Sequence, residues 1–327
     1  MKETEQKTIV IYNLNHSNNR GGSIMKRFTK SLFMVTLIVA LAALFINAQA
    51  QTAEDPFGSI AKRQEMQLKI EKMRAEIAAC GHTFTVEFNP AMQYTIEQLC
   101  NFKPELRPVI EKEELPIGRA AVKPTPPPGD ESYIADYTKV KDQGSCGSCW
   151  AFSTAGMFES VLLKNGISTD LSEQWLVSCN TDGWGCNGGW FANDYYRNPG
   201  AVLEKCFRYK AADLPCKDTC PYEYIATGEG TAGNVSAIKA AIQNYGAVSC
   251  AVTVTSYFQA YSGGVFSYDT HLSVNHAVVL VGWDDSLGSS GAWRMKNSWG
   301  TGWGEGGMMW IEYGASQIGY GGNYLTY

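Results

Sequence analysis

Residues 143–164 constrain this chain most, because a glycine-rich loop there runs into a stretch with apolar residues at helical spacing. Asn165-Gly166 supplies a stop signal, so the pattern predicts a helix with Ser148 and Cys149 in its first turn. A thiol at that place faces unsatisfied backbone N–H groups and the positive end of the helix dipole, which favour the thiolate. Cys149 is therefore a candidate nucleophile.

A nucleophile of this kind needs a base, and the base needs a group that orients it. His276 opens an apolar run of strand character, whereas His271 lies in a polar turn and is expected to face solvent. Twenty-one residues after His276, Asn297 can accept a hydrogen bond from the imidazole, and Trp299 can cover that bond. We predict that Cys149, His276 and Asn297 are catalytic.

Several sequence blocks follow one another in a fixed order: Cys146-Gly147-Ser148-Cys149-Trp150, Leu171-Ser172-Glu173-Gln174, Gly185-Cys186-Asn187-Gly188-Gly189 and Asn297-Ser298-Trp299-Gly300. With them, residues 133–327 resemble the papain-family (cathepsin-like) cysteine proteases. A helical half followed by a strand-rich half is α+β. The resemblance implies a papain-like two-lobed fold, with a helical lobe at about 143–225, a β-barrel-like lobe at about 226–327 and the active site between them.

The resemblance also implies roles for individual residues. The side-chain amide of Gln143 and the backbone N–H of Cys149 are expected to form the oxyanion hole. Gly188 and Gly189 are expected to keep one cleft wall free of Cβ atoms, so that an extended substrate can lie against it. The other substrate-binding residues are expected to be Trp190, Phe191, Val274, Ala277 and Trp299, with Asn323 as the pocket floor. Such a pocket predicts an apolar or aromatic residue two before the scissile bond.

Ten cysteines indicate an oxidising compartment, so we expect a secreted protein. Without Cys149 and the strand-embedded Cys250, the peptidase region keeps six cysteines, which allow fifteen pairings. The resemblance selects Cys146–Cys186 and Cys179–Cys216, which leaves Cys206–Cys220; the pairing of Cys80 and Cys100 stays open. Clustered cysteines can also bind zinc, but their intervals here are irregular, so we expect no metal and no cofactor.

The N-terminal part is predicted to be leader and prosegment. Residues 25–50 combine a basic start, a 15-residue apolar stretch and a small-residue cleavage site, which is typical of a signal peptide; residues 1–24 look like an upstream extension. A membrane anchor is the alternative, but 15 residues fall short of the roughly 20 that span a bilayer. After cleavage we expect no stable membrane insertion.

Residues 51–125 are predicted to be the prosegment and a Pro-rich linker, and 126–327 the peptidase domain, with the boundary between about Arg119 and Asp130. Residues 51–79 predict one amphipathic helix, and Thr95 can cap a short second one. By resemblance the prosegment inhibits the enzyme.

The sequence thus predicts a monomeric, secreted cysteine endopeptidase that cleaves peptide or protein substrates through a thioester acyl-enzyme. A net charge of −5 gives no electrostatic footprint for nucleic acid. An exopeptidase is an alternative, because the loop from Cys206 to Cys220 is long enough to block the cleft, although it contains no histidine. A catalytically idle binding protein is a further alternative, but Gln143, Cys149, His276 and Asn297 are all present.

Overall fold

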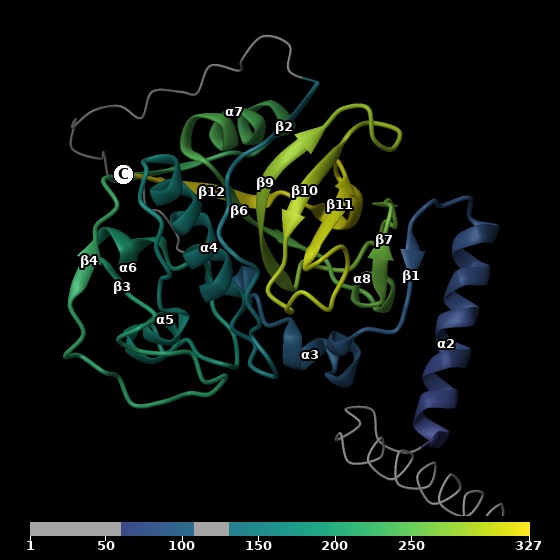
Figure 1. Ribbon diagram of the computed structural model, residues 1–327, viewed down its shortest axis with the longest axis horizontal. Coiled ribbons are helices and arrows are strands. Elements are labelled where there is room, and N and C mark those ends of the chain that lie inside the picture. The colour runs from purple at the N-terminus through teal and green to yellow at the C-terminus, as the bar shows by residue number, and fades with distance from the viewer. Residues whose placement is uncertain (1–59, 108–130) are drawn as a thin grey trace, which may run out of the picture. The chain divides into compact units, whose positions relative to one another are not determined.

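The computed structural model describes residues 60–107 and 131–327 (Figure 1). The predicted upstream extension, the signal peptide and the prosegment boundary between Arg119 and Asp130 lie outside these residues. None of the helices in the two described ranges has the length and apolar character needed to cross a membrane.

Helices dominate the described chain up to residue 200, apart from short strands. The α-helices are α2 (Ile60–Ala79), α3 (Ile96–Leu99), α4 (Cys149–Lys164), α5 (Glu173–Cys179), α6 (Asn193–Arg197), α7 (Val235–Tyr245) and α8 (Ser256–Gln259). Single 3-10 turns are η1 (Pro90–Gln93), η2 (Pro104–Leu106) and η3 (Ala315–Gln317). Side chains cap the N-termini of several helices. Thr95 and Gln98 form a capping box at the start of α3, and the Asn234 side chain caps α7 by accepting a hydrogen bond from Ala237 N.

Strands dominate the second half. They are β1 (Thr85–Val86), β2 (Ser132–Ile134), β3 (Ala201–Val202), β4 (Tyr222–Tyr224), β5 (Gly228–Thr231), β6 (Val248–Val252), β7 (Tyr261–Gly263), β8 (Val265–Phe266), β9 (His276–Asp284), β10 (Ala292–Lys296), β11 (Met308–Glu312) and β12 (Tyr320–Thr326). The main sheet has the order β5-β12-β6-β9-β10-β11-β8, and β2 also pairs with β9. Two-stranded sheets join β1 to β7 and β3 to β4.

Strand β9 is the centre of the main sheet (Figure 1). On one edge it pairs first with β6, from His276 to Leu280, and then with β2, from Gly282 to Asp284. Its other edge pairs with β10. Since successive side chains of a strand point to opposite faces, Ala277, Val279 and Val281 belong to the core around α4, while Val278 and Leu280 belong to the core of the β lobe. Both faces are buried, which explains the uninterrupted apolar run.

Several predicted elements are present in the structure. Helix α4 begins at Cys149, and the helix predicted over 51–79 is described from Ile60 onward, with Ile70, Met73 and Ile77 buried. The structure adds elements that the sequence analysis did not predict, among them α6, α8, β3, β4, β5, β7 and β12. Strand β12 is the most important of these, because it lies between β5 and β6.

Three disulfides tie the helical lobe together: Cys146–Cys186, Cys179–Cys216 and Cys206–Cys220. These are the pairs that the resemblance implied. Cys80 and Cys100, whose pairing stayed open, are both free thiols.

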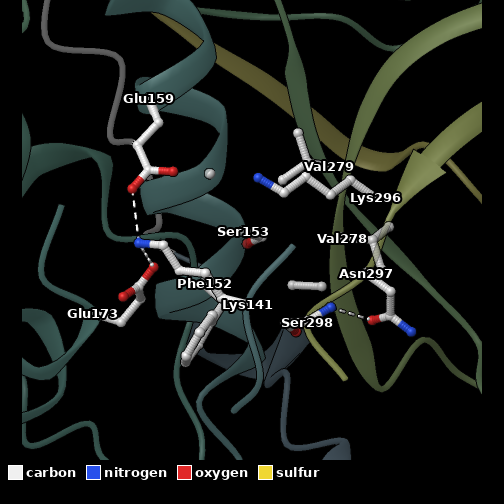
Figure 2. A pocket seen from close by; sticks show the side chains of 12 residues that line it. Lys141, Phe152, Ser153, Glu159, Glu173, Val278, Val279, Lys296, Asn297 and Ser298 are labelled. Atoms are coloured by element: carbon white, nitrogen blue, oxygen red, sulfur yellow. Dashed lines mark hydrogen bonds and ion pairs between the residues drawn. The ribbon is translucent and has the colours of Figure 1, made fainter. Parts of the chain in front are cut away.

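Charged side chains are buried where α4, α5 and β10 approach one another (Figure 2). The ammonium of Lys141 lies 2.8 Å from Glu159 Oε1 and 2.7 Å from Glu173 Oε1, and both carboxyl side chains are almost fully enclosed. Lys296, at the end of β10, donates to Thr138 Oγ1 over 2.9 Å, and Thr138 donates to Glu159. We call Thr138, Lys141, Glu159, Glu173 and Lys296 the interlobe charge cluster.

Burial acts in opposite directions on the two signs of charge in this cluster. Burial raises the pKa of Glu173, and Lys141 lowers it only in part. Burial alone lowers the pKa of Lys141, but Glu173 and Glu159 more than offset this, so its pKa is raised. Because one ammonium serves several carboxylates, Lys141 stays charged, while Glu173 takes up a proton more readily than an ordinary glutamate.

Replacing Lys141 by Met tests whether this ammonium stabilises the fold. Without it, the buried carboxylates of Glu159 and Glu173, and the partly exposed carboxylate of Asp170, lose the cation that they share, so we expect the free energy of unfolding in urea to fall by about 3 kcal/mol. Lys139→Met is the matched control, since its side chain is 72% exposed and pairs with Asp170 at 3.0 Å. That change should cost less than about 1 kcal/mol. Equal losses in the two variants would contradict a stabilising role for the buried ammonium.

Candidate active site

The thiol of Cys149 is fully buried at the start of α4. Burial raises the pKa of this thiol to about 11, although backbone amides of Ala277, Asn101 and Trp150 interact with the sulfur and lower it. The sequence analysis expected the helix start to favour the thiolate. In the described state the amides act in the expected direction, but desolvation outweighs them, so the pKa of the thiol is raised overall.

His276 is the first residue of β9, so a rigid sheet positions its imidazole. Its Nε2 lies 2.8 Å from Asn297 Oδ1, and the Trp299 ring stacks obliquely on it with 4.8 Å between ring centroids. Because Asn297 Oδ1 can only accept, Nε2 carries the proton and Nδ1 is left as the base. Burial lowers the pKa of His276 to about 4, and the bond to Asn297 raises it in part.

The start of β9, which carries His276, lies next to the thiol of Cys149. The backbone amide of Ala277, the residue after His276, interacts with the sulfur of Cys149. Among the described residues, His276 Nδ1 has no hydrogen-bond partner. The structure therefore brings the predicted nucleophile, base and orienting amide together, with the first two electrically neutral.

Gln143 is buried, and both ends of its side-chain amide are hydrogen-bonded, with Nε2 donating to the backbone oxygens of Cys146 and Leu99. Its Oε1 accepts from Ser298 Oγ over 2.7 Å, and its backbone N donates to Ser298 O over 2.8 Å. This fixes the side-chain amide with Nε2 2.8 Å from the backbone oxygen of Leu99. A carbonyl oxygen of the N-terminal region thus occupies the donor that was predicted for the oxyanion hole.

Residues 99–103 lie across the predicted catalytic residues. Phe102 N donates to Asn275 O over 3.0 Å, and Lys103 N donates to Gly189 O over 3.0 Å. In return, Gly189 N donates to Asn101 O over 3.2 Å, so this stretch runs parallel to the chain at Gly189. We call residues 99–103 the cleft segment.

The ring of Phe102 fills an apolar pocket. It lies 4.8 Å from Trp190 and 4.7 Å from Phe191 between ring centroids, and its side chain is almost fully buried. Val274 and Ala277 belong to the same buried cluster. Trp190, Phe191, Val274 and Ala277 are four of the residues that were predicted to bind substrate.

The two predicted wall glycines have different neighbours. A Cβ on Gly188 would come within 2.2 Å of the backbone oxygen of Asn101, so its absence makes room for the cleft segment. A Cβ on Gly189 would instead meet the Trp150 ring at 2.9 Å. At Gly189 the lack of a side chain therefore avoids a clash with Trp150 of the helical lobe. Gly189 binds the cleft segment through its backbone N–H and carbonyl groups.

Asn323, the predicted pocket floor, is buried and already bound at both ends of its amide. Its Oδ1 accepts from Asn193 Nδ2 over 2.9 Å, and its Nδ2 donates to Ser249 O over 3.1 Å. His271 is exposed, as expected.

Sequence reasoning missed three contributors. It gave the cleft segment no role, although the aromatic Phe102 just after a capped turn was a visible signal. It also missed Ser298, whose position next to Asn297 was the only hint. Tyr209 binds the loop of Gln143 and carried no signal in the sequence.

Comparison with known proteins agrees with this geometry. The model of the papain family cysteine proteases matches residues 130–324. Digestive cysteine proteinase 2 of Homarus americanus is 33% identical over 265 residues, which cover 75% of this chain and 80% of that protein. Digestive cysteine proteinase 1 of the same species is 41% identical over 190 residues, but these cover 53% of this chain and 57% of that protein.

Solved structures include digestive procathepsin L 3 of Tenebrio molitor larval midgut, which is 28% identical with a TM-score of 0.66 and coverage of 81% of this chain and 90% of that chain. The chain therefore belongs to the papain family of cysteine proteases. Within that family it is a cysteine-type endopeptidase with an α+β, papain-like fold.

The raised pKa predicts how Cys149 reacts in the intact proenzyme. With a pKa of about 11, the thiolate fraction grows about tenfold with each pH unit up to about pH 10, so alkylation by iodoacetamide should accelerate in proportion. Mass spectrometry of the Cys149 peptide measures this rate, in a Cys80→Ser variant that removes the exposed thiol. A rate that levels off below about pH 9 would contradict a buried, neutral thiol.

Proposed function

We propose that Cys149, His276, Asn297 and Gln143 carry out peptide-bond hydrolysis, and that the cleft segment holds them inactive in the proenzyme. The observation that carries the proposal is the meeting of three groups at one place. The imidazole is bound to Asn297, the thiol lies beside the start of β9, and the amide of Gln143 donates to a peptide carbonyl.

Removal of the cleft segment would readmit water and substrate. The Cys149 proton then passes to Nδ1 of His276, and the thiolate attacks the scissile carbonyl carbon. Negative charge develops on the carbonyl oxygen, where Gln143 Nε2 and the backbone N–H of Cys149 donate to it. The imidazolium returns its proton to the leaving amine, and water then hydrolyses the thioester.

Inhibition by residues 60–107 follows from what the cleft segment occupies. It takes the donor of Gln143, fills the apolar pocket with Phe102 and adds to the burial of the thiol. A proenzyme relationship is in line with the similarity to a procathepsin structure. The same occupancy supports an apolar or aromatic preference two residues before the scissile bond.

The surroundings of the enzyme can be proposed on chemical grounds. Three disulfides support an extracytoplasmic, oxidising location. The relatives named as digestive cysteine proteinases support protein substrates. We propose a secreted endopeptidase whose predicted signal peptide lies outside the described residues.

Asn297→Ala tests the catalytic assignment. Loss of the acceptor should leave the His276 imidazole misoriented, so we expect kcat/KM of the activated enzyme to fall about thirtyfold, or about 2 kcal/mol. Asn297→Asp should recover part of the rate, because a carboxylate also accepts the hydrogen bond, and Cys149→Ser gives the inactive baseline. Unchanged kcat/KM in Asn297→Ala would place the orienting group elsewhere.

Phe102→Ala in the full proenzyme tests the inhibitory role. Removing this ring from its pocket costs about 3 kcal/mol of burial, so labelling of Cys149 by a thiol-directed epoxide should accelerate about a hundredfold. Leu68→Ala is the matched control, because Leu68 is an exposed apolar residue of the same region, with 67% of its surface accessible. Similar labelling rates for both variants would mean that Phe102 does not hold the cleft closed.

A further inference from the structure

The hydroxyl of Tyr209 links the two parts of the site that carry the proposed oxyanion donors. It donates to the backbone oxygen of Gln143 over 2.8 Å and lies 2.6 Å from Ser148 Oγ. A phenol has a single proton, so Ser148 Oγ must donate to the Tyr209 oxygen while Tyr209 donates to Gln143. The result is a chain of two hydrogen bonds from the start of α4 to the loop before it.

Both ends of that chain adjoin the reacting groups. Ser148 immediately precedes Cys149, whose backbone N–H is one proposed donor. Gln143 supplies the other donor through Nε2. The Tyr209 hydroxyl therefore holds the backbone at Gln143 close to the backbone at Ser148. The two proposed donors, Gln143 Nε2 and the N–H of Cys149, must both reach the same substrate oxygen.

Tyr209 is itself held firmly. Its backbone N donates to Glu204 Oε1 over 2.9 Å, and the next residue, Lys210, donates to Gln174 Oε1 over 2.8 Å. Its ring meets Phe152 of α4 edge to face with 4.7 Å between centroids. The Cys206–Cys220 disulfide closes the loop that carries it.

Gln143 is thus attached to both lobes. Ser298 of the β lobe binds its backbone N and its side-chain oxygen, and Tyr209 of the helical lobe binds its backbone oxygen. Without the Tyr209 hydroxyl, Gln143 would lose its direct hydrogen bond to the helical lobe, although the Cys146–Cys186 disulfide would still tie the following part of the loop to that lobe.

We propose that Tyr209 is a positioning residue for the oxyanion hole, through which the loop closed by Cys206–Cys220 contributes to catalysis. This inference rests on the proposed role of Gln143. Donors that stabilise developing charge must be preorganised, and misplacement by about 1 Å can cost about a hundredfold in rate. Tyr209 touches no reacting atom, so its effect should appear only in steps that form an oxyanion.

The test compares two reactions of Cys149 in the enzyme that is obtained when the full-length proenzyme is activated. Peptide hydrolysis forms an oxyanion, whereas alkylation by iodoacetamide does not. Tyr209→Phe removes only the hydroxyl and keeps the ring on Phe152. We expect kcat for an amide substrate to fall about tenfold or more, with KM and the alkylation rate within about twofold of the unmodified enzyme. Ser148→Ala should show a smaller loss of the same kind, because the bond to Gln143 remains.

Tyr261→Phe is the matched control, since its buried hydroxyl also donates to a backbone oxygen, that of Gly264, over 2.6 Å. It should leave kcat unchanged, and its melting temperature should be similar to that of Tyr209→Phe.

Gln143→Ala serves as the reference for loss of the oxyanion donor. If that variant loses kcat but Tyr209→Phe behaves like Tyr261→Phe, the inference is wrong and the role of Gln143 stands. If Tyr209→Phe slows alkylation as much as hydrolysis, Tyr209 affects the reactivity of the Cys149 thiol itself and not the oxyanion hole. That result also overturns the inference. If Gln143→Ala keeps full kcat, the proposed oxyanion role falls, and the inference with it.

Discussion

The site depends on placing a thiol from a helix and an imidazole from a strand in a dry space between two lobes. Cys149 opens α4 and His276 opens β9, so each side chain projects from the end of a rigid element. Residues of β9 reach the cores of both lobes, which fixes the strand against α4. Burial then sets the chemistry, since it raises the pKa of Cys149 and lowers that of His276. The neutral pair is the favoured form while the site is covered.

The same burial has a cost that the structure offsets with polar contacts. Asn297 and Trp299 hold the imidazole, Ser298 and Tyr209 hold Gln143, and the interlobe charge cluster lies nearby (Figure 2). Removing one partner from such a network leaves the other buried and unpaired, which is more costly than never having built the pair. The surroundings of the site are therefore as constrained as the proposed catalytic residues.

Much of this arrangement could be predicted from the sequence, and there is a physical reason why the remaining elements could not. Helices α4 and α7 and strand β9 have local periodicity that survives in the fold. Strand β12 has consecutive glycines at Gly321 and Gly322 and no clear alternation, and it is a strand because β5 and β6 pair with it. The cleft segment takes its conformation from Gln143, Gly189 and Asn275, which are distant in sequence. The disulfide pairs came from the resemblance, because spacing alone left fifteen choices.

The most direct test of the account is the titration of His276 by NMR, in the proenzyme and after removal of the prosegment. The account predicts that the imidazole stays neutral in the proenzyme down to about pH 4, because burial holds its pKa there. A buried histidine of this kind stabilises the folded proenzyme fully above its unfolded pKa of about 6.5 and progressively less as the pH falls toward 4. After removal, the imidazole should be protonated near neutral pH beside the Cys149 thiolate. The same titration curve in both forms would contradict the claim that the cleft segment keeps the pair neutral.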